Sequence, residues 1–283
     1  SSVYTNGTAF HGCAILDNGS VKCWGRNNFG QLGYGDTLNR GDQSVNVGDN
    51  LPAVDLGTGR TATKLAIGQY HTCALLDNNS IKCWGLNSNG QLGQGSTTNR
   101  GDNANEMGDF LTPVNLGTGV TATDISAGNN FSCAITNTGA VKCWGRQDNN
   151  IGQLGIAVNN TNIGDVGAEM GNALASVDLG VGRTAVQIQS GLQFTCVRMD
   201  DNNVKCWGLN SLGQLGLDDT TNRGYTGQLL SASAVNLGVG RTAKKIAVGY
   251  RHACAILDND KMKCWGYGAT GALGYENTTT YGD

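Results

Sequence analysis

The residues in this chain with the clearest capacity for chemistry are its ten cysteines, which recur as five pairs. In every pair nine residues separate the two cysteines, and Trp-Gly follows the second. Paired thiols can form a disulfide, bind a metal ion or take part in redox exchange. The pairs are Cys13 with Cys23, Cys73 with Cys83, Cys133 with Cys143, Cys196 with Cys206, and Cys254 with Cys264.

The spacing of the cysteines argues against a zinc site. Such sites use a second Cys or His at short spacing, and none accompanies these pairs. Two interpretations remain, namely disulfides or buried thiols that serve as small apolar residues. The common register of all five pairs favours disulfides. Because cytosolic reductants keep most such pairs reduced, the sequence predicts an extracellular or cell-surface location.

A β-hairpin would place the two cysteines of each pair opposite one another. If residues 17–19 form a three-residue loop, Leu16 pairs with Ser20 and Cys13 pairs with Cys23. The third loop residue must be left-handed, which glycine adopts at least cost and Asn or Asp tolerates. Facing Cβ atoms lie about 4.5–5.5 Å apart, close to what a disulfide needs. The five repeats supply Gly19, Asn79, Gly139, Asn202 and Asp260 at this position.

The hairpin is part of a longer repeat. The first cysteines lie 60, 60, 63 and 58 residues apart, which indicates an array of supersecondary units. A short strand is expected before each hairpin, at residues 64–68, 124–128, 187–191 and 245–249. A fourth strand is expected after a Gly-Gln-Leu-Gly loop, at residues 53–57, 113–117, 176–180 and 234–238. Four short strands per repeat predict a propeller blade.

Two motifs of the repeat are specific enough to compare with a known family. Residues 71–76 read His-Thr-Cys-Ala-Leu-Leu, and residues 84–93 read Trp-Gly-Leu-Asn-Ser-Asn-Gly-Gln-Leu-Gly. This pattern resembles the repeat of the regulator of chromosome condensation family, and it covers essentially the whole chain. The resemblance implies a β-propeller, commonly of seven blades, around a central channel.

We therefore predict an all-β chain that forms one β-propeller domain over residues 1–283. It would have five four-stranded blades in a closed ring or an open arc, or form part of a longer polypeptide. The repeats cover approximately residues 1–60, 61–120, 121–183, 184–241 and 242–283. The last repeat stops before a fourth strand. Since an unpaired edge attracts another strand, we expect a neighbouring subunit to supply it, giving a head-to-tail ring or fibre.

Charge and hydropathy limit the classes of partner. The net charge is −3 and only 14% of residues are charged, so the chain has no basic surface for nucleic acid and no polybasic membrane patch. Its apolar runs are too short to cross a bilayer. The expected partner is protein, including copies of this chain, with neither nucleic acid binding nor membrane insertion.

Signatures of catalysis are absent from the sequence, which predicts a chain without enzymatic activity and without a cofactor. His11, His71 and His252 share one position of the repeat, where the other two repeats carry Phe131 and Phe194. A position that accepts either His or Phe is expected to serve packing. The five aligned tryptophans are likewise expected to pack between blades, although a photoreceptor of the family uses a tryptophan cluster.

The long loop that precedes the predicted fourth strand is the candidate for ligand chemistry. Carboxylates on glycine-rich turns can coordinate Ca²⁺. The competing interpretation is a solvated loop in which Asp caps turns. The fourth repeat has no equivalent carboxylate, which favours the second interpretation. The candidate calcium ligands are Asp42, Asp49, Asp102, Glu106, Asp109, Asp165 and Glu169.

Asn-x-Ser/Thr sequons predict candidate sites of N-glycosylation. The candidates are Asn6, Asn18, Asn78, Asn159 and Asn277. A sixth sequon, at Asn130, directly precedes a predicted strand and is less suited to a glycan.

The leading functional hypothesis is a non-enzymatic structural or adhesive β-propeller, secreted or displayed on a cell surface. The alternative is a secreted protein-binding module or inhibitor that clamps a partner with loops on one face. Guanine-nucleotide exchange, which the family resemblance implies, is a weaker alternative. A dedicated inhibitor should gather aromatic residues on one set of loops. Because Phe29, Phe110, Tyr225 and Tyr267 look scattered, the sequence favours the structural role.

Overall fold

The computed structural model describes residues 1–158, 161–225 and 234–283. Within these ranges the chain folds into five three-stranded antiparallel sheets. The strands are β1 (Ser2–Tyr4), β2 (His11–Ile15), β3 (Val21–Gly25), β4 (Ala62–Ile67), β5 (His71–Leu76), β6 (Ile81–Gly85), β7 (Ala122–Ala127), β8 (Phe131–Thr136), β9 (Val141–Gly145), β10 (Ala185–Ser190), β11 (Phe194–Met199), β12 (Val204–Gly208), β13 (Ala243–Val248), β14 (His252–Leu257) and β15 (Met262–Gly266). Short 3-10 turns are η1 (Ser44–Asn46), η2 (Gly48–Asn50), η3 (Gly108–Phe110), η4 (Gly167–Glu169) and η5 (Gly171–Ala173).

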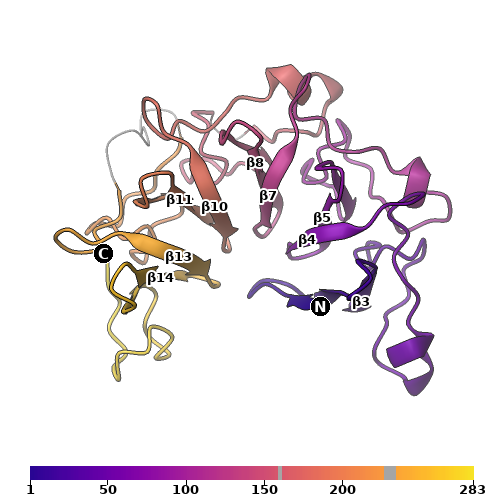
Figure 1. The fold of residues 1–283 in the computed structure, drawn as a ribbon, viewed down its shortest axis with the longest axis horizontal. Helices are drawn as coiled ribbons and strands as arrows, with labels where there is room; N and C mark the ends of the chain where they lie inside the picture. The colour runs from indigo at the N-terminus through magenta and orange to yellow at the C-terminus, as the bar shows by residue number, and fades with distance from the viewer. Residues whose placement is uncertain (159–160, 226–233) are drawn as a thin grey trace.

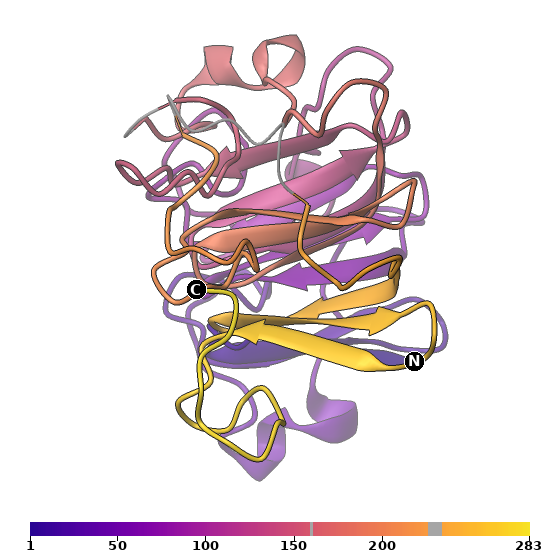
Figure 2. The ribbon, with the colours of Figure 1, turned by 90° about the vertical axis from the view of Figure 1, so that its left-hand side faces the viewer.

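The five sheets are the blades of a propeller, and we number them 1 to 5 in chain order. Figure 1 shows them arranged around a common axis, with β4, β7, β10 and β13 on the inside. Blade 1 and blade 5 lie at the two ends of the arc. Figure 2 turns blade 5, drawn in yellow and orange, toward the viewer. The prediction of an all-β propeller of about five blades is confirmed.

The hairpin of each blade has the predicted register. In blade 1, Cys13 pairs with Cys23, and the amide of Leu16 donates to the carbonyl of Ser20 at 2.9 Å. The third loop residue is left-handed in every blade, with φ of 77°, 64°, 77°, 63° and 63° at Gly19, Asn79, Gly139, Asn202 and Asp260. Turn chemistry therefore fixes which residues face each other across the hairpin.

The structure joins the two cysteines of every hairpin in a disulfide. Their Cα atoms lie 4.0–4.1 Å apart. This separation is typical of a pair without ladder hydrogen bonds, where side chains come closest. In blade 1 the backbone of Cys23 bonds instead to the hydroxyl of Tyr34, which accepts from its N–H and donates to its carbonyl, both at 2.8 Å.

The predicted fourth strand is wrong. Each of these segments makes one backbone hydrogen bond to the blade, as from Val54 N to Val21 O at 2.7 Å, and then leaves the ladder. The reason is that a buried lysine of the next blade takes the following carbonyl. Lys82 Nζ donates to Leu56 O at 3.0 Å, and Lys142 and Lys205 make the same contact in later blades. The apolar side chains of Val54 and Leu56 are nevertheless buried, as the alternation of apolar residues in this segment predicted.

The hydrophobic core lies between blades rather than inside them. One cluster combines Val21 and Val54 of blade 1 with Leu65 and Trp84 of blade 2. The next cluster combines the hairpin of blade 2 with β7 and Trp144 of blade 3. Each blade therefore needs a neighbour to bury its apolar faces, as expected of a repeat architecture. In the described ranges, no helix has the length and hydropathy that a membrane span requires.

Candidate functional site

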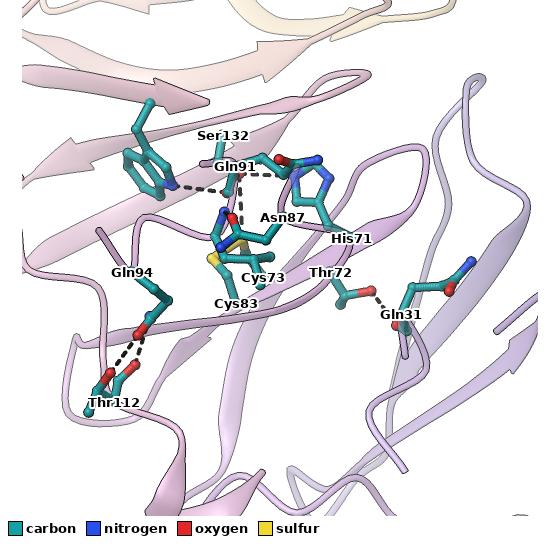
Figure 3. Close-up of a disulfide and its surroundings, with 12 residues drawn as sticks. Gln31, His71, Thr72, Cys73, Cys83, Asn87, Gln91, Gln94, Thr112 and Ser132 are labelled. Carbon is teal, nitrogen blue, oxygen red and sulfur yellow. Dashed lines mark hydrogen bonds between the residues drawn. A yellow bond between two sulfur atoms is a disulfide. The ribbon is translucent and has the colours of Figure 1, made fainter. Parts of the chain in front are cut away.

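Each interior blade boundary is held by one backbone carbonyl of the Gly-Gln-Leu-Gly loop. Gln31 O accepts the indole N–H of Trp84 at 3.1 Å and the hydroxyl of Thr72 at 2.9 Å. Gln91 O accepts the corresponding bonds from Trp144 and Ser132 at the next boundary. Figure 3 shows Gln91 and Ser132 beside the Cys73–Cys83 disulfide. Trp207 and Trp265 bond in the same way to the carbonyls of Gln153 and Gln214. The aligned tryptophans therefore connect one blade to the preceding one.

The buried histidines extend these contacts. His11 Nε2 lies 2.7 Å from Thr72 Oγ1, and His71 Nε2 lies 3.0 Å from Ser132 Oγ. Because the Thr72 hydroxyl donates to Gln31 O, it must accept from His11, so that Nε2 carries the proton. Burial lowers the pKa of His11 to about 3 and that of His71 to about 4. Both rings are therefore neutral and structural at ordinary pH.

A glycine explains why this position takes a flat ring. A Cβ on Gly68 would collide with the imidazole of His71, and a Cβ on Gly128 would collide with the ring of Phe131. The slot over the glycine accepts imidazole and phenyl alike. This contact supports packing as the role of the histidine positions.

The edge of blade 1 is uncovered. Val3 is 71% exposed, whereas its counterpart Leu65 in blade 2 is 2% exposed. Trp24 is 36% exposed, and its indole N–H has no hydrogen-bond acceptor among the described residues, unlike the other four tryptophans. Val47 is also exposed, although Met107 is buried at the same position of blade 2. Among the described residues, no other blade covers this edge.

The edge of blade 5 is uncovered in the complementary way. Ile256 is 41% exposed and Met262 is 63% exposed. Their counterparts in blade 2, Leu75 and Ile81, are buried against β7 and Trp144 of the following blade. Sequence reasoning noticed only a missing strand here. The actual feature is an apolar face that is exposed in the described part of the chain.

Aromatic side chains gather at one further place, between blades 1 and 2. Phe10 stacks on Tyr70 with ring centroids 5.3 Å apart, and Phe29 meets Tyr70 edge-on at the same distance. The guanidinium of Arg26 lies 5.3 Å from the Tyr70 ring and 5.7 Å from the Phe10 ring. The sequence suggested that Phe29 is isolated, but the structure places it in this cluster. The cluster was missed because Phe10 and Tyr70 come from different repeats and meet only across a blade boundary.

Five of the seven candidate calcium ligands, Asp42, Asp102, Glu106, Asp109 and Glu169, accept hydrogen bonds from protein groups. Glu106 Oε2 accepts from Gly101 N at 3.0 Å and Asn103 N at 3.1 Å, and Glu169 does the same for Gly164 and Val166. Asp109 accepts from both the amide and the hydroxyl of Thr58, which lowers its pKa. Asp42 accepts from Asn46. Across the described residues, no three His, Cys, Asp or Glu side chains converge on a point where a metal ion could bind.

The glycosylation candidates differ in how free their side-chain nitrogen is. Asn18 and Asn78 use only their Oδ1 atoms, which accept from Ser20 and Ser80, and both lie exposed at hairpin tips. Asn6 Nδ2 donates to Ala127 O at 2.8 Å, so a glycan on this nitrogen would have to fit beside that contact. Asn277 Nδ2 donates to Tyr275 O. Asn159 lies outside the described residues.

The repeats match a known family along the whole arc. The family model for the Regulator of chromosome condensation (RCC1) repeat matches residues 7–31, 62–91, 122–153, 185–214 and 243–271, and a second RCC1 repeat model matches residues 83–135. This chain belongs to the RCC1 repeat family. Each matched segment contains one hairpin with its disulfide and ends in or near the Gly-Gln-Leu-Gly loop.

Relatives within the RCC1 family are longer than this chain. It is 25% identical over 318 residues to the ultraviolet-B receptor UVR8 of Arabidopsis thaliana, covering 95% of this chain and 66% of the receptor. It is 27% identical over 217 residues to human probable E3 ubiquitin-protein ligase HERC4, covering 76% of this chain and 18% of the ligase. The chain thus spans less than two thirds of either relative.

Solved structures agree on the fold. Human WBSCR16 superposes with a TM-score of 0.71 at 17% identity, covering 96% of this chain and 63% of that one. Yeast RCC1 (Prp20), in its complex with Kap60, gives a TM-score of 0.67 at 20% identity, covering 96% and 57%. At these identities the likeness establishes the RCC1 propeller architecture alone.

Proposed function

We propose that this chain is a non-enzymatic, extracellular structural propeller that assembles head to tail through the open edges of blades 1 and 5. The observation that carries the proposal is the exposure of Val3 and Trp24 at one edge and of Ile256 and Met262 at the other. Inside the arc the equivalent residues are buried by a neighbouring blade. The covering partner at either edge is therefore a blade of the same repeat, and we assign it to a second copy.

The interior boundaries define how the two copies would meet. Ile256 and Met262 of one copy would cover Val3 and Trp24 of the next. Ala272 occupies the position of Gln31 and Gln214, so its carbonyl would accept the Trp24 indole N–H. Burying side chains of this size contributes about 1.5–3 kcal/mol each. The two surfaces differ, so the contact is heterologous and generates a ring or a filament.

The extracellular setting is supported by the five disulfides, which suit an oxidising compartment. Protein as the class of partner is supported by the family, since yeast RCC1 (Prp20) was solved bound to Kap60. Guanine-nucleotide exchange stays a weaker alternative, because it operates where such thiols are kept reduced.

The proposal is tested by the mass of the purified chain in solution. Light scattering after size exclusion, at several loading concentrations, should reveal oligomers that dissociate on dilution. Trp24→Ala should shift the equilibrium toward monomer. Val181→Ala is the matched control, since Val181 is fully exposed in a turn away from both edges. A monomer at every concentration would refute head-to-tail assembly.

A second candidate function, a protein-binding module, is favoured by the cluster of Arg26, Phe10, Tyr70 and Phe29. Arginine and aromatic residues dominate binding hot spots. Arg26 is exposed and forms no ion pair with the described carboxylates, although most other arginines do. Arg26→Glu should then abolish binding of a partner while leaving the oligomeric state unchanged. Loss of oligomers in that variant would assign the cluster to assembly instead.

A further inference from the structure

A groove between blades 1 and 2 departs from the repeat. Its volume is about 370 Å³, and it lies where the Gly-Gln-Leu-Gly loop of blade 1 meets the long loop of blade 2. Blade 1 contributes Tyr34 and Pro52 to its walls, and blade 2 contributes Met107 and Phe110. We call this cavity the Phe110 groove. Because it lies between two successive blades, it is separate from the exposed edges of blades 1 and 5.

Backbone hydrogen bonds hold the two walls of the groove in place. Gly35 N donates to Gly101 O at 3.1 Å, and Gly108 N donates to Asp55 O at 3.1 Å. Each of these bonds joins blade 1 to the long loop of blade 2. The loop is held further by Glu106, whose carboxylate accepts from two amides of the same loop. The groove is therefore preorganised, which lowers the entropy cost of binding a ligand.

The next boundary carries a side-chain contact that the groove lacks. Gln94 and Thr112 of blade 2 bond to one another, with Gln94 Nε2 donating to Thr112 O at 3.0 Å (Figure 3). Their counterparts in blade 1 are Tyr34 and Pro52. The Tyr34 hydroxyl bonds to the backbone of Cys23 instead, and proline has neither an N–H nor a hydroxyl to offer. No such bond therefore crosses the groove.

An aromatic ring is exposed at the groove. Phe110 is 72% exposed, and its position in the repeat carries Asn50 in blade 1 and Ala173 in blade 3. The packing of a blade therefore does not require a ring here. The negative face of an aromatic ring attracts polarised C–H groups. One face of a pyranose sugar presents such groups, so Phe110 is suited to stack on a sugar ring.

Polar groups without protein partners accompany this ring. Asp55 Oδ1 accepts from the amide two residues later at 2.9 Å, while its Oδ2 accepts no hydrogen bond from the described residues. Oδ1 of Asn103 and the whole side-chain amide of Asn105 are also without partners in the described part of the chain. Blade 3 has Val166 and Ala168 at the positions of these two asparagines. The groove thus offers a carboxylate and two amides, which can bond to hydroxyl groups as donors and acceptors.

The charges at the groove favour a neutral ligand. Arg40, the cation that lines it, is paired with Asp36 at 2.7 Å and lies 5.3 Å from the centre of the Tyr34 ring. The nearby ammonium group of Lys82 donates to two backbone carbonyls. Asp55 forms no ion pair within the described residues. Its carboxylate would repel an anion, whereas a hydroxyl group can donate to it.

We propose that the Phe110 groove binds a neutral carbohydrate. One sugar ring stacks on Phe110, and its hydroxyl groups donate to Asp55 and bond to the amides of Asn103 and Asn105. The volume lies within the range of ligand pockets, in which apolar contact supplies affinity and a few polar groups fix orientation. The site does not depend on head-to-tail assembly, since none of these residues lies at the exposed edges.

The probes are the neutral trisaccharides maltotriose, cellotriose, mannotriose and chitotriose, with trigalacturonate as an anionic probe. Binding to the full chain is measured by titration in saturation-transfer difference NMR. We expect a neutral trisaccharide to bind saturably with a dissociation constant of about 1 mM, as the modest energy per ligand atom predicts for one bound ring. Trigalacturonate should bind more weakly. The proposal is overturned if no neutral probe binds saturably, or if only trigalacturonate or a blocked oligoproline peptide does.

Two variants test whether the sugar binds in the groove. Phe110→Ala, which introduces the residue of blade 3, should weaken binding by about tenfold. Asp55→Asn should weaken it by about fivefold, because a hydrogen bond to a charged acceptor is the stronger one. The turn at this position is retained with asparagine, since Asn115 Oδ1 accepts the equivalent amide bond in blade 2 at 3.0 Å.

The matched control is Val166→Ala, which removes an exposed apolar side chain from the same loop of blade 3 and should leave binding unchanged. Equal binding by the wild type and Phe110→Ala would place the sugar elsewhere and overturn the proposal. Trp24→Ala should bind the sugar normally, and Phe110→Ala should keep the oligomeric state of the wild type. Failure of the groove and failure of head-to-tail assembly are therefore distinguishable.

Discussion

The indole N–H of Trp84 donates to the backbone carbonyl of Gln31 in the preceding blade, over 3.1 Å. The same carbonyl accepts the hydroxyl of Thr72, which in turn accepts from His11. One peptide group therefore connects a tryptophan, a hydroxyl and an imidazole from three parts of the sequence. Because this unit repeats along the arc, a change at one boundary can be compared with a natural equivalent at another.

The buried histidines predict that stability falls in mild acid. Their native pKa values, about 3 for His11 and about 4 for His71, lie below the ordinary value of 6.5. As the pH decreases from 6.5, the unfolded chain binds protons that the native chain does not, so the free energy of unfolding falls until the pH reaches about 4 for His71 and about 3 for His11. Each histidine should lower the free energy of unfolding by about 2 kcal/mol at pH 5 relative to pH 8.

Phenylalanine at the same position gives the natural control. Phe131 and Phe194 occupy it in blades 3 and 4, each over a glycine. In His71→Phe, denaturant unfolding should retain more stability at pH 5 than the wild type does, relative to the value of each at pH 8. An identical pH dependence in both proteins would mean that His71 does not titrate on unfolding in this range.

Because the buried lysines donate to backbone carbonyls, we expect removal of one ammonium group to lower the free energy of unfolding substantially. Lys82 is buried, bonds two carbonyls, and has its pKa lowered by burial. Lys82→Met would leave Leu56 O and Gly108 O without their donor. We expect a loss of about 1–3 kcal/mol per unsatisfied group in urea unfolding. Lys22→Met, which removes one exposed hydrogen bond, should change stability by less than about 1 kcal/mol; equal effects would contradict this account.

The hairpins were predictable because their determinants are local. The left-handed position at Gly19 and the register from Cys13 to Cys23 are separated by only a few residues, and turn chemistry specifies both. The fate of the predicted fourth strand could not be predicted from local sequence, because a lysine from the next blade competes for the carbonyl of Leu56. The alternation of apolar residues at Val54 and Leu56 correctly predicted that both are buried, but it contains no information on their backbone hydrogen bonds. The error is thus a tertiary contact overriding a local pattern.

The open edges needed the structure for a different reason. Val3, Trp24, Ile256 and Met262 are ordinary repeat residues in the sequence, and only comparison with covered counterparts shows that they are exposed. In this repeat protein, the edges were found by comparing the exposed fraction of each residue with that of its counterpart in another blade.

The disulfides predict resistance to reduction in the native state. Cys13, Cys133 and Cys143 are fully buried, and the described chain has no free cysteine to begin exchange. A water-soluble phosphine should therefore reduce the folded chain slowly and the unfolded chain rapidly. Replacing Cys73 and Cys83 together by serine should lower the free energy of unfolding by about 2–3 kcal/mol. Thiol counting by mass spectrometry, and denaturant unfolding of the double variant, check the two parts.

The contact proposed between His252 and blade 1 of a second copy leads to a gain-of-function prediction. Thr72 and Ser132 supply the hydroxyl that meets a histidine of the preceding blade, whereas blade 1 has Gly12 at that position. A Cβ on Gly12 would make only ordinary contacts, 3.4 Å from Trp24 and 3.5 Å from Tyr4 O. Gly12→Ser should therefore fold normally and offer a hydroxyl to His252 of a second copy.

In the proposed contact between blade 5 of one copy and blade 1 of the next, this hydroxyl would also donate to Ala272 O, as Thr72 donates to Gln31 O. Two added hydrogen bonds of ordinary net strength should tighten head-to-tail association by about tenfold. Sedimentation equilibrium measures the change, and Gly12→Ala is the matched control because it adds the methyl group without the hydroxyl. If serine and alanine have the same effect, the edge of blade 5 does not meet blade 1 through His252, and the geometry proposed for the joint is wrong.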